Sequence, residues 1–308
     1  MRISNSSYNS YNLCPRQYKF NYIDKVYVPE RAEFYFGKLI HTIIQYALKK
    51  DPIFPSEDEL LLMLKNAWKV DAFKDEEEAD QYYTFGIDII KKFYASHKPA
   101  LRNIIATEKF FEIPLNNKHV LTGKIDRIDK LPIGAIEIID YKTDKTLPSQ
   151  SDVDKNNQLT IYNLATENLW PEVKEIRLTL YFLKFSTKMS SSRRPDEIES
   201  VKENLIKTAD AIEKDKQFAP KKNPLCNWCS YQNICPLWRN KIGNCELEIE
   251  NCDDIDDILK EYLEQRKKLA SIENKIKSYF EASKTENYKY KNILVSRTND
   301  KLKFKKVE

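Results

Sequence analysis

The sequence predicts an α/β fold built around a mixed β-sheet. Apolar and polar residues alternate in three stretches, 104–115, 120–142 and 176–185, and a period of two indicates strands. The segment between the last two stretches, 154–169, has the apolar spacing of a helix. Strands that flank a helix of this length are typical of an α/β core with a mixed sheet.

The stretch 120–142 predicts a β-hairpin whose second strand carries charged residues at its end. A short break with Pro and Gly separates its two β-rich halves. Because side chains alternate along a strand, Asp140 and Lys142 share a face, and Asp126 on the partner strand comes within reach of Asp140. Two carboxylates beside one ammonium could hold a hard divalent cation with a charged neighbour able to act on phosphate. The alternative is a cross-strand ion pair on a solvated face, and the hairpin alone favours neither.

Helical patterns precede the strands. The segment 34–50 predicts a helix on which Gly37 and His41 share a face at positions i and i+4. A single histidine on such a helix is more often a core residue than a ligand. Two further helical patterns occupy 57–98, so we expect a helical insertion over 43–103, before the sheet begins.

Four further segments are expected after the last strand. They are a polar basic loop at 186–194, a helix at 196–213, a long amphipathic helix at 253–282, and a terminal hairpin made of 288–296 and 301–307. The arginines of the loop could contact a phosphate backbone, but an exposed connection is the favoured interpretation.

Composition indicates a globular protein with room for one catalytic domain and additions, or two modest domains. The chain has 308 residues, of which 32% are charged and 41% hydrophobic. No apolar run at the N-terminus or elsewhere is long enough for a membrane span, so we expect a cytoplasmic, intracellular protein. The net charge of +4 is too small to establish a nucleic-acid partner. The last 25 residues carry a local basic surplus, which fits either a solvated tail or a phosphate contact.

Cysteine spacing indicates a metal or cluster site. Cys226, Cys229 and Cys235 form the pattern C-x2-C-x5-C-P, and Cys14, which also precedes a proline, is the candidate fourth ligand. In a cytosolic protein such spacing favours metal binding over disulfides. Four thiolates suit either zinc or an iron–sulfur cluster. Two cysteines outside this spacing are interpreted as spare thiols: Cys245 and Cys252.

The order of these features resembles the RecB-like branch of the PD-(D/E)xK nucleases. The closest resemblance is to members that bear an iron–sulfur cluster, namely the AddB nuclease domain, the CRISPR adaptation nucleases and exonuclease V. It extends from about Cys14 to Pro236 and rests on Cys14-Pro15-Arg16, Gly37-x3-His41, Gly123-x2-Asp126, Asp140-x-Lys142, Gln158-x3-Tyr162 and the three late cysteines.

The resemblance implies a restriction-endonuclease-like core whose ends are closed by the cysteine-ligated cluster. The expected nuclease domain covers 1–249. Residues 250–308 lie outside the match and form an extension made of a helix and a small basic hairpin.

The resemblance also implies roles for the site residues. The ligands of Mg²⁺ or Mn²⁺ would be His41, Asp126, Asp140 and the backbone carbonyl of Tyr141. Lys142 would orient or help deprotonate the attacking water and offset charge on the phosphate, while Gln158 and Tyr162 would position Lys142 or the DNA strand. Arg16 is a weaker candidate for a phosphate contact, with an ion pair near the cluster as the alternative. Asp140 stands where many members of the superfamily have glutamate, but the RecB and AddB domains also use aspartate.

These expectations point to a metal-dependent DNA exonuclease that acts on single-stranded ends and contains a structural [4Fe–4S] cluster, with Zn²⁺ as the alternative. Such an enzyme would serve DNA repair, recombination, phage replication or CRISPR adaptation. One alternative is a DNA-binding or assembly subunit of a helicase or integrase complex, and another is a structure-specific endonuclease. The chain has no Gly-rich phosphate loop followed by Lys-Ser or Lys-Thr, so we expect no ATP site.

Overall fold

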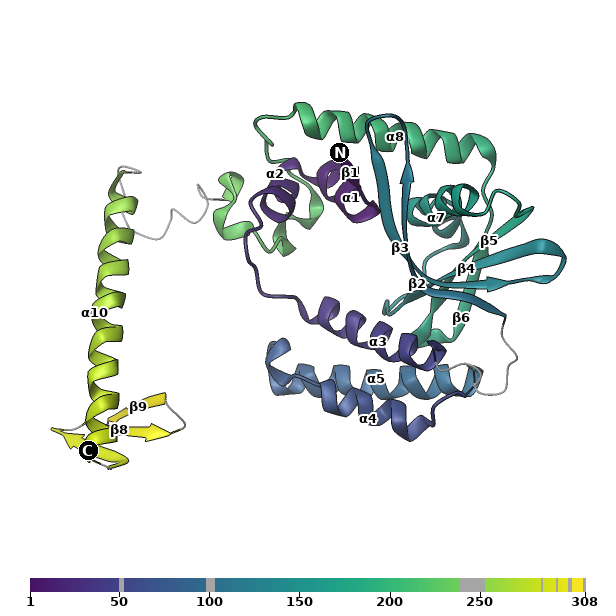
Figure 1. Cartoon of the computed structure of the whole chain (residues 1–308). Helices are drawn as coiled ribbons and strands as arrows, with labels where there is room; N and C mark the ends of the chain where they lie inside the picture. The colour runs from purple at the N-terminus through teal and green to yellow at the C-terminus, as the bar shows by residue number, and fades with distance from the viewer. Residues whose placement is uncertain are drawn as a thin grey trace. The chain divides into compact units, whose positions relative to one another are not determined.

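A computed structural model describes residues 1–49, 53–97, 103–238, 253–283, 285–291, 293–298 and 301–306 (Figure 1). The chain divides into two compact units, Met1–Asn240 and Lys241–Glu308, which are described separately. Where the catalytic domain ends and the extension begins, expected near residue 249, stays a prediction.

The first unit is organised around a six-stranded sheet with the order β1-β3-β4-β5-β6, in which β2 also pairs with β3. The β1–β3 and β4–β5 pairs are parallel, and the other three pairs are antiparallel. The predicted mixed sheet is therefore confirmed. The strands are β1 (Arg2–Ile3), β2 (Ile104–Pro114), β3 (Val120–Lys130), β4 (Ala135–Lys142), β5 (Glu175–Phe182) and β6 (Thr187–Ser191).

The predicted hairpin is formed by β3 and β4, but the two strands separate before β4 ends. Their ladder runs from Lys130–Ile136 to Arg127–Ile139. Beyond Ile139, β4 continues as far as Lys142 in parallel pairing with β5. The split therefore opens beside the end of β4, where the sequence places Asp140 and Lys142.

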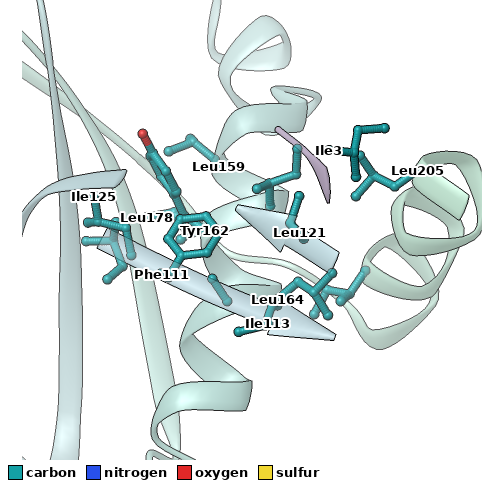
Figure 2. Close-up of a cluster of buried hydrophobic side chains, with 14 of the residues drawn as sticks. Ile3, Phe111, Ile113, Leu121, Ile125, Leu159, Tyr162, Leu164, Leu178 and Leu205 are labelled. Carbon is teal, nitrogen blue, oxygen red and sulfur yellow. The ribbon is translucent and has the colours of Figure 1, made fainter. Parts of the chain in front are cut away.

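One face of the sheet is covered by helices from both ends of the first unit, as Figure 1 shows for α7 and α8. A continuous apolar cluster joins this face to α7 (Asn157–Leu169) and α8 (Pro195–Lys214), with Tyr18 contributed by α2 (Pro15–Tyr18). Figure 2 shows Tyr162 among the apolar side chains of this cluster. A short helix, α1 (Asn5–Leu13), precedes α2, and η1 (Lys19–Ile23) follows it.

Gly123 on β3 is required by the packing of this cluster. A Cβ atom at Gly123 would lie 2.4 Å from Cζ of Phe111, far closer than two carbon atoms can approach. The Phe111 ring, 2% exposed, in turn lies edge-on to the Tyr162 ring with their centroids 6.4 Å apart. The absence of a side chain at Gly123 therefore makes room for the ring that supports Tyr162.

The opposite face is covered by three helices that come before β2 in the chain. They are α3 (Ala32–Lys49), α4 (Glu57–Ala67) and α5 (Glu76–His97), with the short turn η2 (Val70–Ala72) between the last two. A second apolar cluster joins these helices to Ile139, Tyr141 and Tyr181 of the sheet. The order of helices expected for this region is thus present. α5 begins within an acidic run at residues 75–78, where carboxylates favour a helix N-terminus.

Three local expectations need correction. The segment 186–194, expected to be a loop, contains edge strand β6, and Arg193 donates from Nη2 to the carbonyls of Val153 and Asn156 at 3.2 and 3.0 Å. The strand expected to reach residue 185 ends at Phe182 and continues as the 3-10 turn η4 (Leu183–Phe185). The helix expected from residue 154 begins at Asn157, because Asn156 caps its N-terminus, and a separate short helix, α6 (Gln150–Asp154), precedes it.

The second unit contains the predicted long helix, α10 (Asp253–Ser283), and a three-stranded antiparallel sheet. The strands are β7 (Asn287–Tyr290), β8 (Ile293–Thr298) and β9 (Lys301–Lys306). The stretch expected as one strand from 288 to 296 is itself folded into two paired strands. The turn expected at 298–300 lies partly outside the described residues, as do Cys245 and Cys252. Among the described helices of both units, none combines the length and apolarity that crossing a membrane requires.

Candidate active site

A cleft of about 760 Å³ opens at the split between β3 and β4. It is lined by side chains of α3, the β2–β3–β4 sheet and α7, so every wall belongs to an element of the first unit. The ionisable lining residues are Glu33, Lys38, His41, Glu108, Lys124, Asp126, Asp140, Tyr141, Lys142, Asp144 and Tyr162. Six of the seven residues predicted to bind the metal or act on the phosphate appear among these, and the seventh, Gln158, also lines the cleft.

Asp140 is buried and held by three neighbours. Its Oδ1 atom accepts a hydrogen bond from Gln158 Nε2 at 3.0 Å and lies 3.0 Å from the Tyr162 hydroxyl. Its Oδ2 atom lies 2.6 Å from Lys142 Nζ. Because Asp140 is only 3% exposed, these contacts fix its carboxylate before any cation arrives.

Gln158 and Tyr162 connect Asp140 to both strands of the hairpin. Gln158 accepts a hydrogen bond from Lys142 Nζ at 2.9 Å and donates to the Tyr162 hydroxyl at 2.8 Å. The Tyr162 hydroxyl also lies 3.0 Å from the carbonyl of Lys124 on β3. Its one proton serves either that carbonyl or Asp140. The two α7 residues therefore span the split, as their spacing of four predicts.

Lys142 is an ammonium in this environment. Burial lowers the pKa of its side chain, but the carboxylate of Asp140, followed by that of Asp126, outweighs burial and raises the pKa above its ordinary value. A partly buried cation that is fixed by Asp140 and Gln158 can offset negative charge on a phosphate.

Asp126 lies between Asp140 and the helix α3. Its Oδ2 atom accepts a hydrogen bond from the Tyr141 backbone N–H at 3.0 Å and lies 3.4 Å from His41 Nδ1. Burial, followed by the nearby charge of Asp140, raises the pKa of Asp126 to about 6. Burial and the neighbouring carboxylates thus disfavour the charged form of Asp126. A bound dication would offset this repulsion and favour the charged form.

Sequence reasoning missed Glu108 on β2. One ligand atom from each of His41, Glu108 and Asp126 lies within 4.8 Å of the others. Glu108 also forms an ion pair with Lys124. An imidazole and carboxylates form a donor set that suits Mg²⁺ or Mn²⁺. In the sequence, the only signal for Glu108 is an acid within the alternating strand 104–115, and this signal is weak because strands often carry exposed charges.

The four predicted cluster ligands line one cavity of about 130 Å³ in the first unit. Cys14 comes from the junction of α1 and α2, whereas Cys226, Cys229 and Cys235 come from the turns η5 (Pro224–Trp228) and η6 (Gln232–Ile234) and their ends. All four are free thiols. Backbone N–H groups of Lys221 and Asn223 donate to the sulfurs of Cys14 and Cys226 at 3.4 and 3.3 Å.

The four cysteines lie close enough for a charge on one to affect the pKa of another. Burial raises the pKa of Cys229, and the nearby Cys14, Cys235 and Cys226 raise it further. Thiolates that repel one another in this way are stabilised by a cation or cluster among them. The donor set therefore fits a thiolate-ligated group.

Arg16 follows Cys14 on α2, and its side chain contacts protein groups. Its Nη2 atom donates to the carbonyl of Gln217 at 3.1 Å, and its guanidinium carbon lies 5.9 Å from the centre of the Phe20 ring. A phosphate contact by Arg16 stays a prediction.

Comparison with known protein families agrees with this geometry. The profile of the PD-(D/E)XK nuclease superfamily matches residues 2–236. The chain is 25% identical over 112 residues to one subunit of an ATP-dependent helicase/deoxyribonuclease from Streptococcus agalactiae, covering 35% of this chain and 10% of that protein. It is 26% identical over 115 residues to the corresponding protein from Streptococcus uberis, covering 36% and 11%. The chain thus spans about a tenth of the length of the curated relatives it matches. A solved structure from Eubacterium rectale, provisionally described as an exonuclease, has a TM-score of 0.46 and 10% identity, covering 75% of this chain and 87% of the other.

Proposed function

Because the chain belongs to the PD-(D/E)XK nuclease superfamily, we propose that it is a divalent-metal-dependent DNA exonuclease that acts on single-stranded ends. One observation carries the proposal. Lys142 lies 2.6 Å from Asp140 at the end of β4, and the metal-type ligands His41 and Asp126 line the same cleft. This arrangement matches the needs of phosphodiester hydrolysis, which are a dication, an oriented water and a charge to offset the phosphate.

The residues divide this work into metal binding and contact with the phosphate. His41, Asp126 and Asp140, with the carbonyl of Tyr141, are the proposed metal ligands. A divalent cation bound there would polarise the phosphate and lower the pKa of the attacking water. Lys142 contacts a phosphate oxygen or the water, and Gln158 holds its ammonium in position through their 2.9 Å hydrogen bond.

An exposed aromatic residue in the cleft supports single-stranded DNA as the substrate. Phe34 on α3 is 62% exposed and lines the cleft together with Lys38 and Lys124. Unpaired bases stack on exposed aromatic rings while lysines contact the backbone, a combination typical of single-strand binding. In duplex DNA the faces of the bases are covered by their neighbours, so Phe34 could stack only on a terminal base pair.

The cysteine cavity supports a [4Fe–4S] cluster more than zinc. Tetrahedral zinc with bonds of about 2.3 Å requires its four sulfurs to lie about 3.8 Å apart. Among the described residues, the groups whose ligand atoms all lie within 4.8 Å of one another contain no cysteine. In a cubane cluster each thiolate binds a different iron, which places the sulfurs at the corners of a larger tetrahedron.

Digestion of end-labelled single-stranded DNA tests the nuclease assignment. We expect Mg²⁺- or Mn²⁺-dependent degradation by the wild type and its loss in Asp140→Asn and Lys142→Gln. Asp88→Asn is the matched control, because Asp88 pairs with Lys92 at 2.7 Å on the surface of α5. A wild-type protein that degrades no form of DNA with either cation would overturn the assignment.

Circular single-stranded DNA separates end-dependent digestion from internal cleavage. An exonuclease degrades the linear form and leaves the circle intact. Cleavage of both forms at similar rates would assign the cleft to an endonuclease instead.

Iron and zinc analysis of the intact protein tests the cluster. We expect about four irons for each chain, together with a brown colour that fades in air. Zinc without iron would assign the cysteines to a zinc site.

The names of the curated relatives favour a motor partner. Those proteins are subunits of ATP-dependent helicase/deoxyribonucleases, and we propose that this chain works with a separate helicase. Copurification of a helicase with the intact chain is the expected result, and the alternative of a purely DNA-binding subunit predicts copurification without metal-dependent hydrolysis.

A further inference from the structure

Glu108 has a backbone conformation that is unusual for its place in a strand. Its neighbours on β2, Thr107 and Lys109, pair with Arg127 and Ile125 of β3. Between these pairs Glu108 has a φ of 51°, in the left-handed region, where a residue with a side chain is strained. Its side chain is only 12% exposed and its carboxylate lines the catalytic cleft.

The direction of this side chain brings a third element to the metal ligands. His41 comes from α3, Asp126 from β3 and Glu108 from β2, and their ligand atoms lie within 4.8 Å of one another. An octahedral cation with bonds of about 2.1 Å places its ligands about 3 Å apart when adjacent and about 4.2 Å apart when opposite. Small side-chain rotations would therefore let all three bind one ion.

Lys124 supplies the positive charge beside Glu108. Its ammonium forms an ion pair with the Glu108 carboxylate, and its side chain is 56% exposed in the cleft. An ion pair of this exposure contributes little to stability, so it does not by itself explain why a largely buried acid has a strained backbone.

A second ion pair on the same strand shows the ordinary arrangement. Glu112 on β2 pairs with Arg2 at 2.9 Å, its side chain is 40% exposed, and it does not line the cleft. Glu112 is absent from the residues with positive φ. Glu112 therefore forms an ion pair at the surface, whereas Glu108 is largely shielded from solvent and lies among metal-type ligands.

We propose that Glu108 is a further ligand of the divalent cation at Asp126, and that the cation displaces Lys124 from Glu108 and frees it to contact the DNA backbone. This inference rests on the proposed metal-dependent function and deepens it. Lys124 is then a phosphate contact that becomes available only when the metal site is filled.

Mn²⁺ binding by the DNA-free protein tests the first half, by calorimetry or by the electron paramagnetic resonance signal of free Mn²⁺. We expect Glu108→Gln to weaken Mn²⁺ binding about 10-fold, within the range typical of lost metal-site interactions. Lys124→Met should bind Mn²⁺ as tightly as the wild type or more tightly, because it removes the competitor. Glu112→Gln is the matched control and should leave the affinity unchanged.

A structural ion pair makes the opposite prediction. If Glu108 and Lys124 only stabilise the sheet, the two variants should change Mn²⁺ affinity in the same direction or leave it within about 2-fold of the wild type. Either result would overturn the proposal. Glu108→Gly guards against misfolding, because glycine adopts a φ of 51° without strain. This variant should melt at or above the wild-type temperature and still lose Mn²⁺ affinity, whereas wild-type affinity in Glu108→Gly would also overturn the proposal.

Binding of fluorescent single-stranded DNA tests the second half, with Ca²⁺ in place of Mg²⁺ to suppress cleavage. Lys124→Met should weaken DNA binding in the presence of Ca²⁺ and have little effect without a divalent cation. An equal effect under both conditions would contradict the exchange of Lys124. If the proposed function fails, the wild type shows no metal-dependent hydrolysis. If only this inference fails, Asp140→Asn is inactive while Glu108→Gln keeps the Mn²⁺ affinity of the wild type.

Discussion

The acidic cleft and the cysteine cavity differ in what holds them together. In the cleft, Asp140 is 3% exposed. It accepts a hydrogen bond from Gln158 of α7 and forms an ion pair with Lys142 of β4. In the cavity, three of the four cysteines are half-buried and lie on short turns. The cleft is thus organised by protein groups alone. If the proposed cluster binds to the four cysteines, the structure of the cavity should depend on it.

Replacing the cleft lysine should give the largest effect and leave the fold intact. Lys142→Gln keeps a hydrogen-bonding side chain beside Asp140 but removes the charge that faces the phosphate. We expect the turnover number on single-stranded DNA to fall about 10³-fold, the size typical of a lost electrostatic stabiliser, with a melting temperature close to that of the wild type. A large drop in melting temperature with little loss of turnover would reverse the assignment of the two regions.

Replacing a cluster cysteine should instead act on stability. Loss of the cofactor in Cys229→Ala would release a link between Cys14 and the 226–235 turns, which closes a loop of roughly 200 residues. Closing a loop of this size is worth about 5 kcal/mol, or about 10 °C in melting temperature for a domain of this size. Thermal melts and metal content check the result.

Two cysteines outside the predicted ligand set, Cys245 and Cys252, provide the control for this stability change. Cys245→Ala and Cys252→Ala should keep the metal content and the melting temperature of the wild type. Loss of the cofactor in either variant would show that the ligand set is wrong.

Asp126 should lower the stability of the metal-free protein at high pH, where its buried carboxylate is charged. Burial and Asp140 raise the pKa of Asp126 from 3.8 to about 6, so its contribution to stability is fully present below about pH 4 and is lost as pH rises through 6. In Mg²⁺- and Mn²⁺-free buffer, Asp126→Asn should therefore be more stable than the wild type at pH 8, by an amount on the order of 2 kcal/mol. Urea unfolding at pH 5 and pH 8 checks this, because the advantage must shrink at the lower pH. An advantage of equal size at both values would exclude titration of Asp126 as its cause.

Tyr162 should give the smallest of these effects. Tyr162→Phe keeps the ring in the apolar cluster of Figure 2 but removes the hydroxyl that lies 3.0 Å from Asp140. We expect turnover to fall about 10-fold with little change in KM, because a hydrogen bond from a hydroxyl to a carboxylate is worth about 1.5 kcal/mol. An unchanged turnover would show that Gln158 and Lys142 position Asp140 without it.

The sequence predicts the elements whose periodicity is strong. The hairpin, α7 and α10 follow from alternating or helical apolar patterns, and the approach of Asp140 to Lys142 follows from the alternation of side chains along a strand. Family resemblance adds His41, Gln158 and Tyr162, which the structure brings into the same cleft.

The remaining features depend on contacts that periodicity does not encode. β6 has a polar sequence and is a strand because it pairs with the edge of β5, so its local propensity is misleading. The break before α7 does have a local signal, since Asn156 is a good N-cap residue. Glu108 could not be predicted, because a left-handed residue inside a strand is set by tertiary structure.

The close approach of Gly123 to Phe111 explains why a glycine precedes Asp126 by three residues. Gly123 and Asp126 lie on one strand. Gly123 leaves room for the Phe111 ring, which packs against Tyr162 beside Asp140. Filling the space at Gly123 with even a methyl group would therefore be felt on the far side of the cleft, at Asp140. The Gly-x-x-Asp spacing thus helps to set the relative positions of the two carboxylates. A design that transfers this site to another scaffold must keep the space at Gly123 along with the charged groups.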